Sequence, residues 1–366
     1  MKNSRAAARS PYMEWAKLCS SAKFNLATSG IASFPLAELN VRIEQLEING
    51  PDGYGYPPLL RAIATRYRVT EESVVSAMGT SFANYLALAA ATEPGDEILV
   101  EQPAYDPMLR AADYLGLEVR RFLRPAETNF AIDWEDLERK LTSRTRVIVI
   151  TNFHNPSGVF LSDDEMRKVA SLARKVGAFI LVDEVYREML FASRPQTAFH
   201  IDPERFLITS SLTKAYGLSG LRCGWVLAPP ELAQRMRHIN DLHGSTFTHP
   251  GELLSVTAFA NLAQITDRAK TLLETNRKLL RAFLDSRDDL DYCWPDYGTI
   301  VFPRLRRRNT EAFCRNLRDQ FQTSVVPGSF FECPDRFRIG VGTATEEVRA
   351  GLEQLGKALD RLPKLP

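Results

Sequence analysis

The chain has 366 residues, of which 45% are hydrophobic and 25% charged, and its formal net charge is +1. This length exceeds the usual limit for one hydrophobic core, so two subdomains are expected. The near-neutral charge excludes a general attraction to nucleic acid or anionic membrane and favours a small-molecule partner. The five cysteines are scattered and never form a C-x-x-C pattern, which favours free thiols over disulfides or a metal site.

The N-terminal region, residues 1–23, is predicted to be a loose arm that enters a first helix. Its opening stretch, MKNSRAAARSPY, has no apolar run long enough for a signal peptide. The most apolar helical stretch, residues 85–91, is far too short to span a membrane. These features predict a cytoplasmic protein with no membrane contact.

A loop rich in glycine and proline follows at residues 49–57 and carries Tyr54, before a helix that starts near Pro58. Residues 74–78 then read as a strand and residues 82–91 as an apolar helix. Between them lies a turn of small residues, Gly79, Thr80 and Ser81. Such a turn offers backbone N–H groups at the positive end of a helix, which indicates an anion site, although N-terminal caps of this composition are common.

Short apolar strands alternate with helices through the middle of the chain. The predicted strands are residues 98–100, 117–122, 147–150, 179–182, 206–208 and 225–228, and the clearest helices are residues 133–141 and 162–177, the second opened by a capping box. Polar residues follow each strand. This pattern predicts an α/β fold with a parallel sheet that binds its ligand at the carboxyl ends of the strands.

The remainder of the chain predicts a second, smaller α+β unit. Residues 231–287 are mostly helical, strands are expected at 299–302 and 336–341, and helices at 310–322 and 345–362. Nothing before residue 45 is expected to fold alone, so the N-terminal segment is assigned to this unit. The predicted division is a large domain of residues 46–265 and a small domain of residues 1–45 and 266–366.

Residues 205–225, RFLITSSLTKAYGLSGLRCGW, form the stretch around which the rest is organised. An apolar strand leads into a hydroxyl cluster, then to Lys214, and then to a glycine-rich turn with Arg222. Because burial disfavours an ammonium, a lysine at a strand end can act as a neutral amine and form a Schiff base with a carbonyl. The alternative for this segment alone is a surface lysine in a loop.

Taken in order, these motifs resemble the class I/II aminotransferases, pyridoxal-phosphate enzymes of fold type I in the aspartate aminotransferase superfamily. The resemblance rests on N-P-S-G at 155–158, D-E-V-Y at 183–186, S-L-T-K at 211–214 and the arginine at 222. It implies an α/β fold, in which a large domain with a mostly parallel seven-stranded sheet flanked by helices joins a smaller α+β domain built from both chain ends.

The resemblance also implies roles for individual residues. The expected catalytic residues are Lys214, which would form the Schiff base with pyridoxal 5'-phosphate and move a proton, Asp183 at the pyridine nitrogen, and Tyr186 and Asn155 at the phenolic oxygen. Tyr105 would stack on the cofactor ring. The expected phosphate ligands are Gly79, Thr80, Ser81, Ser211, Arg222 and, from a neighbouring subunit, Tyr54.

Substrate binding is expected at Arg338, whose guanidinium would hold the α-carboxylate together with Asn155, and at Gly30, where the N-terminal segment closes over the substrate. The resemblance implies amino acid and 2-oxo acid substrates and a homodimer with shared active sites. Members specialised for aspartate carry a second arginine in the region that here spans residues 243–250. No arginine occurs between Arg237 and Arg268, so strict dicarboxylate specificity is not expected.

The predicted function is therefore a pyridoxal-phosphate-dependent aminotransferase. Its closest alternative is a lyase, cyclase or synthase that uses the same cofactor on an amino acid. A non-catalytic sensor that binds the cofactor is a weaker alternative, since the chain has no basic helix for DNA. A nicotinamide dehydrogenase is weaker still, because no G-x-G-x-x-G follows the first strand.

Overall fold

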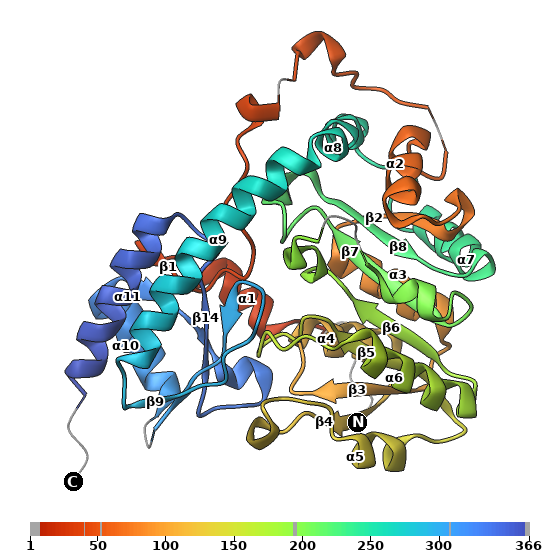
Figure 1. Cartoon of the computed structure of the whole chain (residues 1–366). Coiled ribbons are helices and arrows are strands. Elements are labelled where there is room, and N and C mark those ends of the chain that lie inside the picture. The colour runs from red at the N-terminus through yellow and green to blue at the C-terminus, as the bar shows by residue number, and fades with distance from the viewer. Residues whose placement is uncertain (1–7, 40, 52, 193–195, 307–308, 363–366) are drawn as a thin grey trace.

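The computed structural model describes residues 8–39, 41–51, 53–192, 196–306 and 309–362. A seven-stranded sheet forms its centre, in the spatial order β2-β8-β7-β6-β5-β3-β4 (Figure 1). The strands are β2 (Val74–Met78), β3 (Glu97–Gln102), β4 (Glu118–Leu123), β5 (Thr145–Thr151), β6 (Phe179–Asp183), β7 (Phe206–Ser211) and β8 (Cys223–Leu227). β8 runs antiparallel to both of its neighbours, while the other pairs are parallel. The α/β fold with a mostly parallel sheet is confirmed.

Helices cover both faces of this sheet because its inner strands are apolar on both faces. The helices of this part are α2 (Pro57–Tyr67), α3 (Thr80–Ala91), α4 (Asp106–Leu115), α5 (Trp134–Lys140), α6 (Asp163–Val176), α7 (Pro230–Asp241) and α8 (His249–Ala260). Val147 and Val149 face a core shared with α3, α4 and α7. Ile148 and Ile150, which alternate with them, face the core on the side of α2 and α6.

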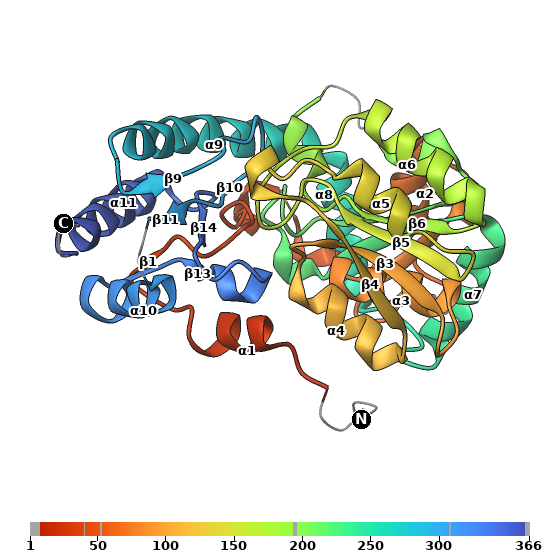
Figure 2. The same cartoon turned by 90° about the horizontal axis from the view of Figure 1, so that it is seen from below.

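A smaller unit combines residues from both ends of the chain (Figure 2). Its strands are β1 (Phe24–Asn25), β9 (Leu290–Asp291), β10 (Ile300–Val301), β11 (Arg304–Leu305), β12 (Thr323–Ser324), β13 (Val326–Pro327) and β14 (Phe337–Gly340), and its helices are α1 (Pro11–Leu18), α9 (Leu262–Asp285), α10 (Thr310–Phe321) and α11 (Thr345–Asp360). β1 pairs with β12, which joins the N-terminal segment to the C-terminal one.

Capping residues explain why several helices begin where the sequence predicts. Ser162 accepts from the backbone N–H of Glu165 while the Glu165 carboxylate accepts from the backbone N–H of Ser162, and Gly177 ends the helix in the left-handed region. At α3, in contrast, the helix begins two residues earlier than predicted, because Thr80 and Ser81 already belong to its first turn.

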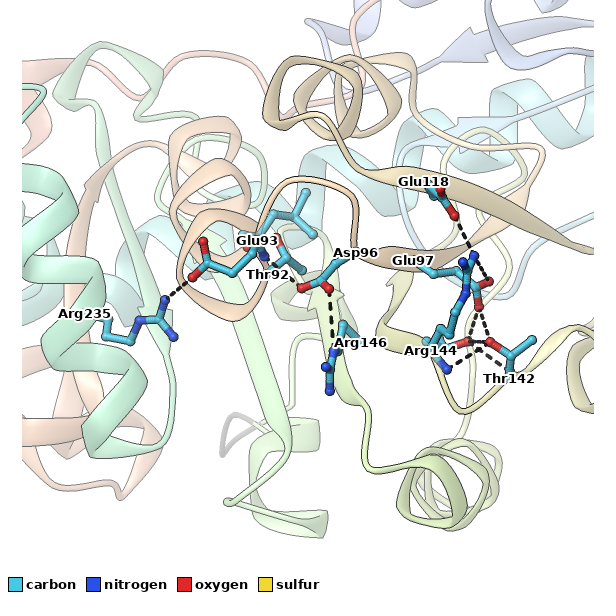
Figure 3. Close-up of polar contacts among 11 residues, drawn as sticks. Thr92, Glu93, Asp96, Glu97, Glu118, Thr142, Arg144, Arg146 and Arg235 are labelled. Atoms are coloured by element: carbon cyan, nitrogen blue, oxygen red, sulfur yellow. Dashed lines mark hydrogen bonds and ion pairs between the residues drawn. The ribbon is translucent and has the colours of Figure 1, made fainter. Parts of the chain in front are cut away.

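Charged side chains are paired at the amino ends of the central strands. Glu97, the first residue of β3, accepts hydrogen bonds from the Thr142 and Thr145 hydroxyls, at 2.7 and 2.6 Å. Arg144 bridges Glu97 and Glu118, and the Glu93–Arg235 and Asp96–Arg146 pairs lie nearby (Figure 3). These opposite charges neutralise one another, so we assign the amino edge of the sheet a structural role.

Two further properties bear on function. Within the part of the chain that the structure describes, no helix is both long and apolar enough to cross a bilayer. The same residues contain no cluster of histidine, cysteine and carboxylate side chains that could bind a metal ion, and all five cysteines are free thiols.

Candidate active site

Asp183 is the last residue of β6 and lies at the carboxyl edge of the sheet. Its side chain is buried, and its oxygens accept hydrogen bonds from Asn84 Nδ2 at 2.9 Å and from the backbone N–H of Val185 at 3.0 Å. Burial raises the pKa of Asp183 to about 6, although these bonds and the nearby charge of Lys214 act in the opposite direction. The site therefore holds a carboxyl group that forms no ion pair with a cation among the described residues.

Lys214 follows β7, one strand away from Asp183, and is only partly exposed. Desolvation lowers the pKa of Lys214, and the positive charges of Arg338 and Arg222 act in the same direction. No carboxylate among the described residues forms an ion pair with this ammonium within 4.0 Å. Lys214 thus has the chemical character of an amine that can become neutral and nucleophilic.

Gly30 lies directly against Lys214. A Cβ built on Gly30 would lie 3.3 Å from Lys214 Cδ, and the backbone N–H of Ile31 donates to the Lys214 carbonyl at 2.8 Å. The N-terminal segment is therefore anchored beside the lysine, and a side chain at position 30 would crowd it.

Tyr186 and Asn155 extend the cluster on its substrate side. The Tyr186 hydroxyl donates to Ser29 Oγ at 2.8 Å, and burial raises the pKa of Tyr186 to about 12, so the hydroxyl keeps its proton. Asn155 is buried in the loop after β5, and its Oδ1 accepts from Arg338 Nη1 at 2.7 Å. The structure thus connects Asn155 directly to the predicted carboxylate ligand.

Arg338 is fully buried, and no carboxylate among the described residues forms an ion pair with it. Its Nη2 donates to the Tyr12 hydroxyl at 3.1 Å and to the Ala27 carbonyl at 2.9 Å, while its Nε has no hydrogen-bond partner among the described residues. A buried guanidinium is costly unless it is paired with an anion. Arg338 is therefore a strong candidate for binding the carboxylate of a ligand.

The turn between β2 and α3 approaches Arg222 closely. Gly79 has φ +81°, and a Cβ added there would lie only 2.4 Å from Arg222 Nη2. Thr80 Oγ1 donates to Ser211 Oγ at 2.8 Å, and Ser81 lies exposed in the first turn of α3. Backbone N–H groups, hydroxyls and a guanidinium thus gather at one helix N-terminus, a combination that suits a dianion.

The two remaining predicted residues differ in their surroundings. The Tyr105 ring lies edge-on to Tyr12, with 5.6 Å between ring centroids, and interacts electrostatically with Asp183 and Arg338. Tyr54 is 45% exposed, and its hydroxyl donates to Asp241 at 3.3 Å. Among the described residues, no hydrogen bond or ring contact joins Tyr54 to another predicted site residue.

The structure adds three residues that the sequence reasoning missed. Asn84 on α3 bonds to Asp183 and to Thr209, Ser29 bonds to Tyr186, and Tyr12 on α1 bonds to Arg338. Asn84 could have been found as a polar residue in the otherwise apolar helix TSFANYLALAAA. For Tyr12 the sequence offers no comparable signal, because its neighbours read only as a short helix.

Comparison with known proteins agrees with this geometry. The family model described as "Aminotransferase class I and II" matches residues 37–355. Capreomycidine synthase of Streptomyces vinaceus is 30% identical over an alignment of 351 positions, which covers 92% of this chain and 90% of that protein. A probable N-succinyldiaminopimelate aminotransferase of Mycobacterium tuberculosis is 30% identical over 77% of this chain and 74% of its own length.

A solved structure extends the likeness to nearly every residue. The crystal structure of a pyridoxal-phosphate-dependent aminotransferase from Streptococcus suis superposes with a TM-score of 0.90 at 27% identity, covering 98% of this chain and 99% of that one. The likeness therefore includes the central sheet and the smaller unit.

Proposed function

This chain belongs to the class I and II aminotransferase family and is a pyridoxal-phosphate-dependent transferase, and from that premise we propose that it exchanges an amino group between an amino acid and a 2-oxo acid. The observation that carries the proposal is the environment of Lys214. The amine of Lys214, a half-buried residue, has a pKa lowered by desolvation, forms no ion pair with a carboxylate among the described residues, and lies one strand from the buried Asp183.

The residues of the site fit pyridoxal phosphate. Arg222 and the turn at Gly79 would hold the phosphate, and the close approach of the Arg222 guanidinium to Gly79 supports this because it brings a positive charge to the N-terminus of α3. Asp183 would pair with the pyridine nitrogen, which offsets the cost of burying its carboxylate. When bound, the cofactor supplies an aldehyde that condenses with amines and a ring that accepts electrons from the substrate α-carbon.

Lys214 has two tasks in this proposal. Its neutral amine would hold the aldehyde of the cofactor, and as a free amine it would move a proton at the substrate α-carbon. The lowered pKa of Lys214 favours both tasks because it increases the neutral fraction. Gly30 leaves room for this movement, since its missing side chain would contact Lys214 Cδ.

Tyr186 and Asn155 would contact the phenolic oxygen of the cofactor. Tyr186 keeps its proton at neutral pH because burial raises its pKa to about 12, and it would donate that proton to the cofactor oxygen in place of its present acceptor, Ser29 Oγ. Asn155 accepts from Arg338 through Oδ1, which leaves its Nδ2 free to donate. Tyr105 would pack against the cofactor ring, and Ser211 and Thr80 would contribute hydroxyls to the phosphate.

The substrate carboxylate would bind at Arg338. Its unpaired Nε supports this assignment, because a bound carboxylate would supply the missing acceptor and the counter-charge together. Residues 243–250 contribute no arginine, and His243 in this region instead bonds to Tyr85 and to the Ile239 carbonyl. We therefore expect substrates other than aspartate to be preferred.

We further propose a homodimer in which Tyr54 reaches the phosphate of the partner. The exposure of Tyr54 supports this, since its hydroxyl donates to Asp241 on the surface of its own chain. The division into a large domain of residues 46–265 and a small domain of 1–45 and 266–366 is likewise proposed. It would allow the small domain to close over bound substrate.

A second candidate is a synthase, cyclase or lyase reaction with the same cofactor. The supporting observation is the 30% identity to capreomycidine synthase over 92% of the chain. The residues discussed above bind and activate any amino acid, while the bond that breaks depends on its orientation in the pocket. A sensor without catalysis has no specific observation in its favour.

The distinguishing experiment uses purified protein loaded with pyridoxal phosphate. Each amino acid of a panel is added, and the absorbance of the bound cofactor is followed before and after addition of 2-oxoglutarate and pyruvate. Transamination predicts conversion to the amino form of the cofactor and reversal by a 2-oxo acid. Product formation without reversible conversion would support the second candidate and exclude transamination.

A further inference from the structure

Tyr12, on the N-terminal helix α1, lies inside the candidate site. Its hydroxyl accepts a hydrogen bond from Arg338 Nη2 at 3.1 Å, and its ring is edge-on to Tyr105 with 5.6 Å between centroids. The side chain is only 8% exposed, and Phe331 packs against it on the side of the smaller unit. Tyr12 therefore stands between the arginine proposed for the substrate carboxylate and the tyrosine proposed for the cofactor ring.

The hydrogen bonding of Tyr12 leaves its proton available. The oxygen accepts from Arg338, and no acceptor for the O–H proton is found among the described residues. Asn155 is in a similar position, since its Oδ1 accepts from Arg338 and its Nδ2 is free. Together with the unpaired Nε of Arg338, these groups are hydrogen-bond donors around a single guanidinium.

We propose that Tyr12 is a substrate-binding residue whose hydroxyl donates to the same carboxylate that Arg338 binds, so that α1 forms part of the active site. This inference rests on the proposed function, because it takes Arg338 as the carboxylate ligand. It extends that function by assigning specificity for the carboxylate to a helix from the N-terminal segment.

Electrostatics are consistent with this role. Burial alone would raise the pKa of Tyr12, but the positive charges of Arg338 and Lys214 outweigh it and lower the pKa. A carboxylate bound to Arg338 would offset that positive charge and stabilise the protonated phenol. The ligand would therefore keep Tyr12 in the form that can donate.

The position of α1 is fixed from both sides, which makes Tyr12 a rigid part of the site. On one side the Ser10 hydroxyl donates to Asp106 at the start of α4, and the Tyr105 hydroxyl contacts Met13 Sδ. On the other side Trp15 packs against Phe330 with 5.5 Å between ring centroids. In Figure 2 α1 lies beside both the smaller unit and α4.

The test compares two small amines that react with the bound cofactor and differ in a carboxylate. Aminooxyacetate carries one and methoxyamine does not, so the ratio of their second-order rate constants measures carboxylate recognition without requiring the natural substrate. In Tyr12→Phe this ratio should fall about tenfold, as expected for the loss of one hydrogen bond to a charged group. The rate with methoxyamine should stay within about twofold, since the ring is kept.

Control variants separate binding from structure. Trp15→Phe disturbs the packing of α1 without removing a contact to Arg338, so its ratio should equal that of wild type. Arg338→Lys should reduce the ratio more strongly than Tyr12→Phe, because it removes the bidentate ligand itself. The melting temperatures of all variants are measured alongside.

The outcomes are distinct. An unchanged ratio in Tyr12→Phe, with a normal preference of wild type for aminooxyacetate, overturns the role of Tyr12 and leaves the proposed function intact. An equal loss of rate with both reagents also overturns it, because that result indicates structural damage. If wild type reacts with neither reagent, the proposed cofactor chemistry itself fails.

Discussion

Asp183 and Lys214 show how the fold changes the chemistry of ordinary ionisable side chains. Both lose water, and since desolvation disfavours charge, the carboxyl pKa rises while the ammonium pKa falls. At the opposite edge of the sheet Glu97 is equally buried, but the Thr142 and Thr145 hydroxyls and two arginines surround it. Glu97 is thus neutralised by its own neighbours, whereas Asp183 and Lys214 at the carboxyl edge are not. This contrast indicates that the carboxyl edge is the ligand-binding edge.

Asp183→Asn should change how the stability of the cofactor-free protein depends on pH. Because the folded pKa of about 6 lies above the ordinary value of 3.8, this side chain contributes stability at low pH that is lost as the pH rises through 6. From about pH 5 to about pH 8, wild type should lose roughly 1.4 kcal/mol relative to the variant. Urea unfolding of both proteins at both pH values measures their free energies of unfolding. If the difference between wild type and variant were the same at the two pH values, the pKa of Asp183 would not be raised in the folded protein.

Asn84 should position Asp183 for the cofactor. Asn84→Leu removes the donor to Asp183 and the acceptor for Thr209, so the affinity for pyridoxal phosphate should fall about tenfold, the value of one hydrogen bond to a charged group. Equilibrium titration of the cofactor-free protein, followed by absorbance, gives the affinity. Asn240→Leu, a change of another buried asparagine on α7, serves as the control and should bind normally.

The individual residues differ in how far the sequence predicts them. Lys214, Asp183 and Asn155 follow or end strands of the central sheet, so its topology brings them to one edge. Arg338 lies within β14 of the smaller unit and meets them through packing between the two parts. Tyr12 could not be predicted, because its position depends on how the N-terminal segment crosses to the C-terminal strands, and that packing leaves no periodic pattern in the sequence. Tyr54 remains a prediction, since its role depends on a second chain.

At the scale of elements, the turn from β2 into α3 is the most constrained piece of the site. Gly79 has a positive φ, and Gly224 on β8 is packed so tightly that a Cβ there would lie 2.6 Å from Gly79 Cα. Because neither glycine has a side chain, the backbone of the turn can lie directly against β8 and against the Arg222 guanidinium. The sequence predicted this turn as an anion site, but not the dependence on Gly224, which comes from the antiparallel pairing of β8 with β2.

Gly79→Ala should impair cofactor binding. The added Cβ would collide with Arg222 Nη2, and the alanine would have to adopt a positive φ that is unfavourable for it. The affinity for pyridoxal phosphate should therefore fall by about tenfold or more. Gly177→Ala is a matched control, because Gly177 also has a positive φ but open space around its Cβ. The control should lose about 1 kcal/mol of stability and bind the cofactor normally. Equal affinities in the two variants would contradict the proposed phosphate site.

At the scale of the molecule, the segment between β1 and α2 indicates a partner surface. Figure 1 shows this part of the chain running outside the body. Two isoleucines of this segment, Ile43 and Ile48, are 79% and 82% exposed. Leu242, which directly follows α7, is a further exposed apolar residue, at 84%. We expect these exposed apolar side chains to contribute to an interface with a second copy, the partner that the role proposed for Tyr54 requires.

Ile48→Asp should weaken self-association. A charge in an apolar interface is costly, so the dimer dissociation constant should rise by about 100-fold or more and cofactor-dependent turnover should fall with it. Sedimentation velocity over a dilution series measures the change. Leu123→Asp, at an exposed site on edge strand β4, should associate like wild type. A wild-type protein that is monomeric at all concentrations would exclude shared active sites.

The overall architecture follows from the sequence to a large extent. Alternating apolar strands and helices predicted the parallel sheet, and the ends of most elements lie within a few residues of the predicted positions. The short strands of the smaller unit were predicted less completely, because two-residue strands such as β1 and β12 carry no periodicity. Their pairing arises from tertiary contacts between the two ends of the chain.

The most direct measurement is to locate the covalent bond between cofactor and protein. The protein loaded with pyridoxal phosphate is reduced with borohydride, digested, and analysed by mass spectrometry. The account predicts one phosphopyridoxyl group, on Lys214, and none on the same chain with Lys214→Ala. Stoichiometric labelling of a different lysine, or retained labelling in that variant, would contradict it.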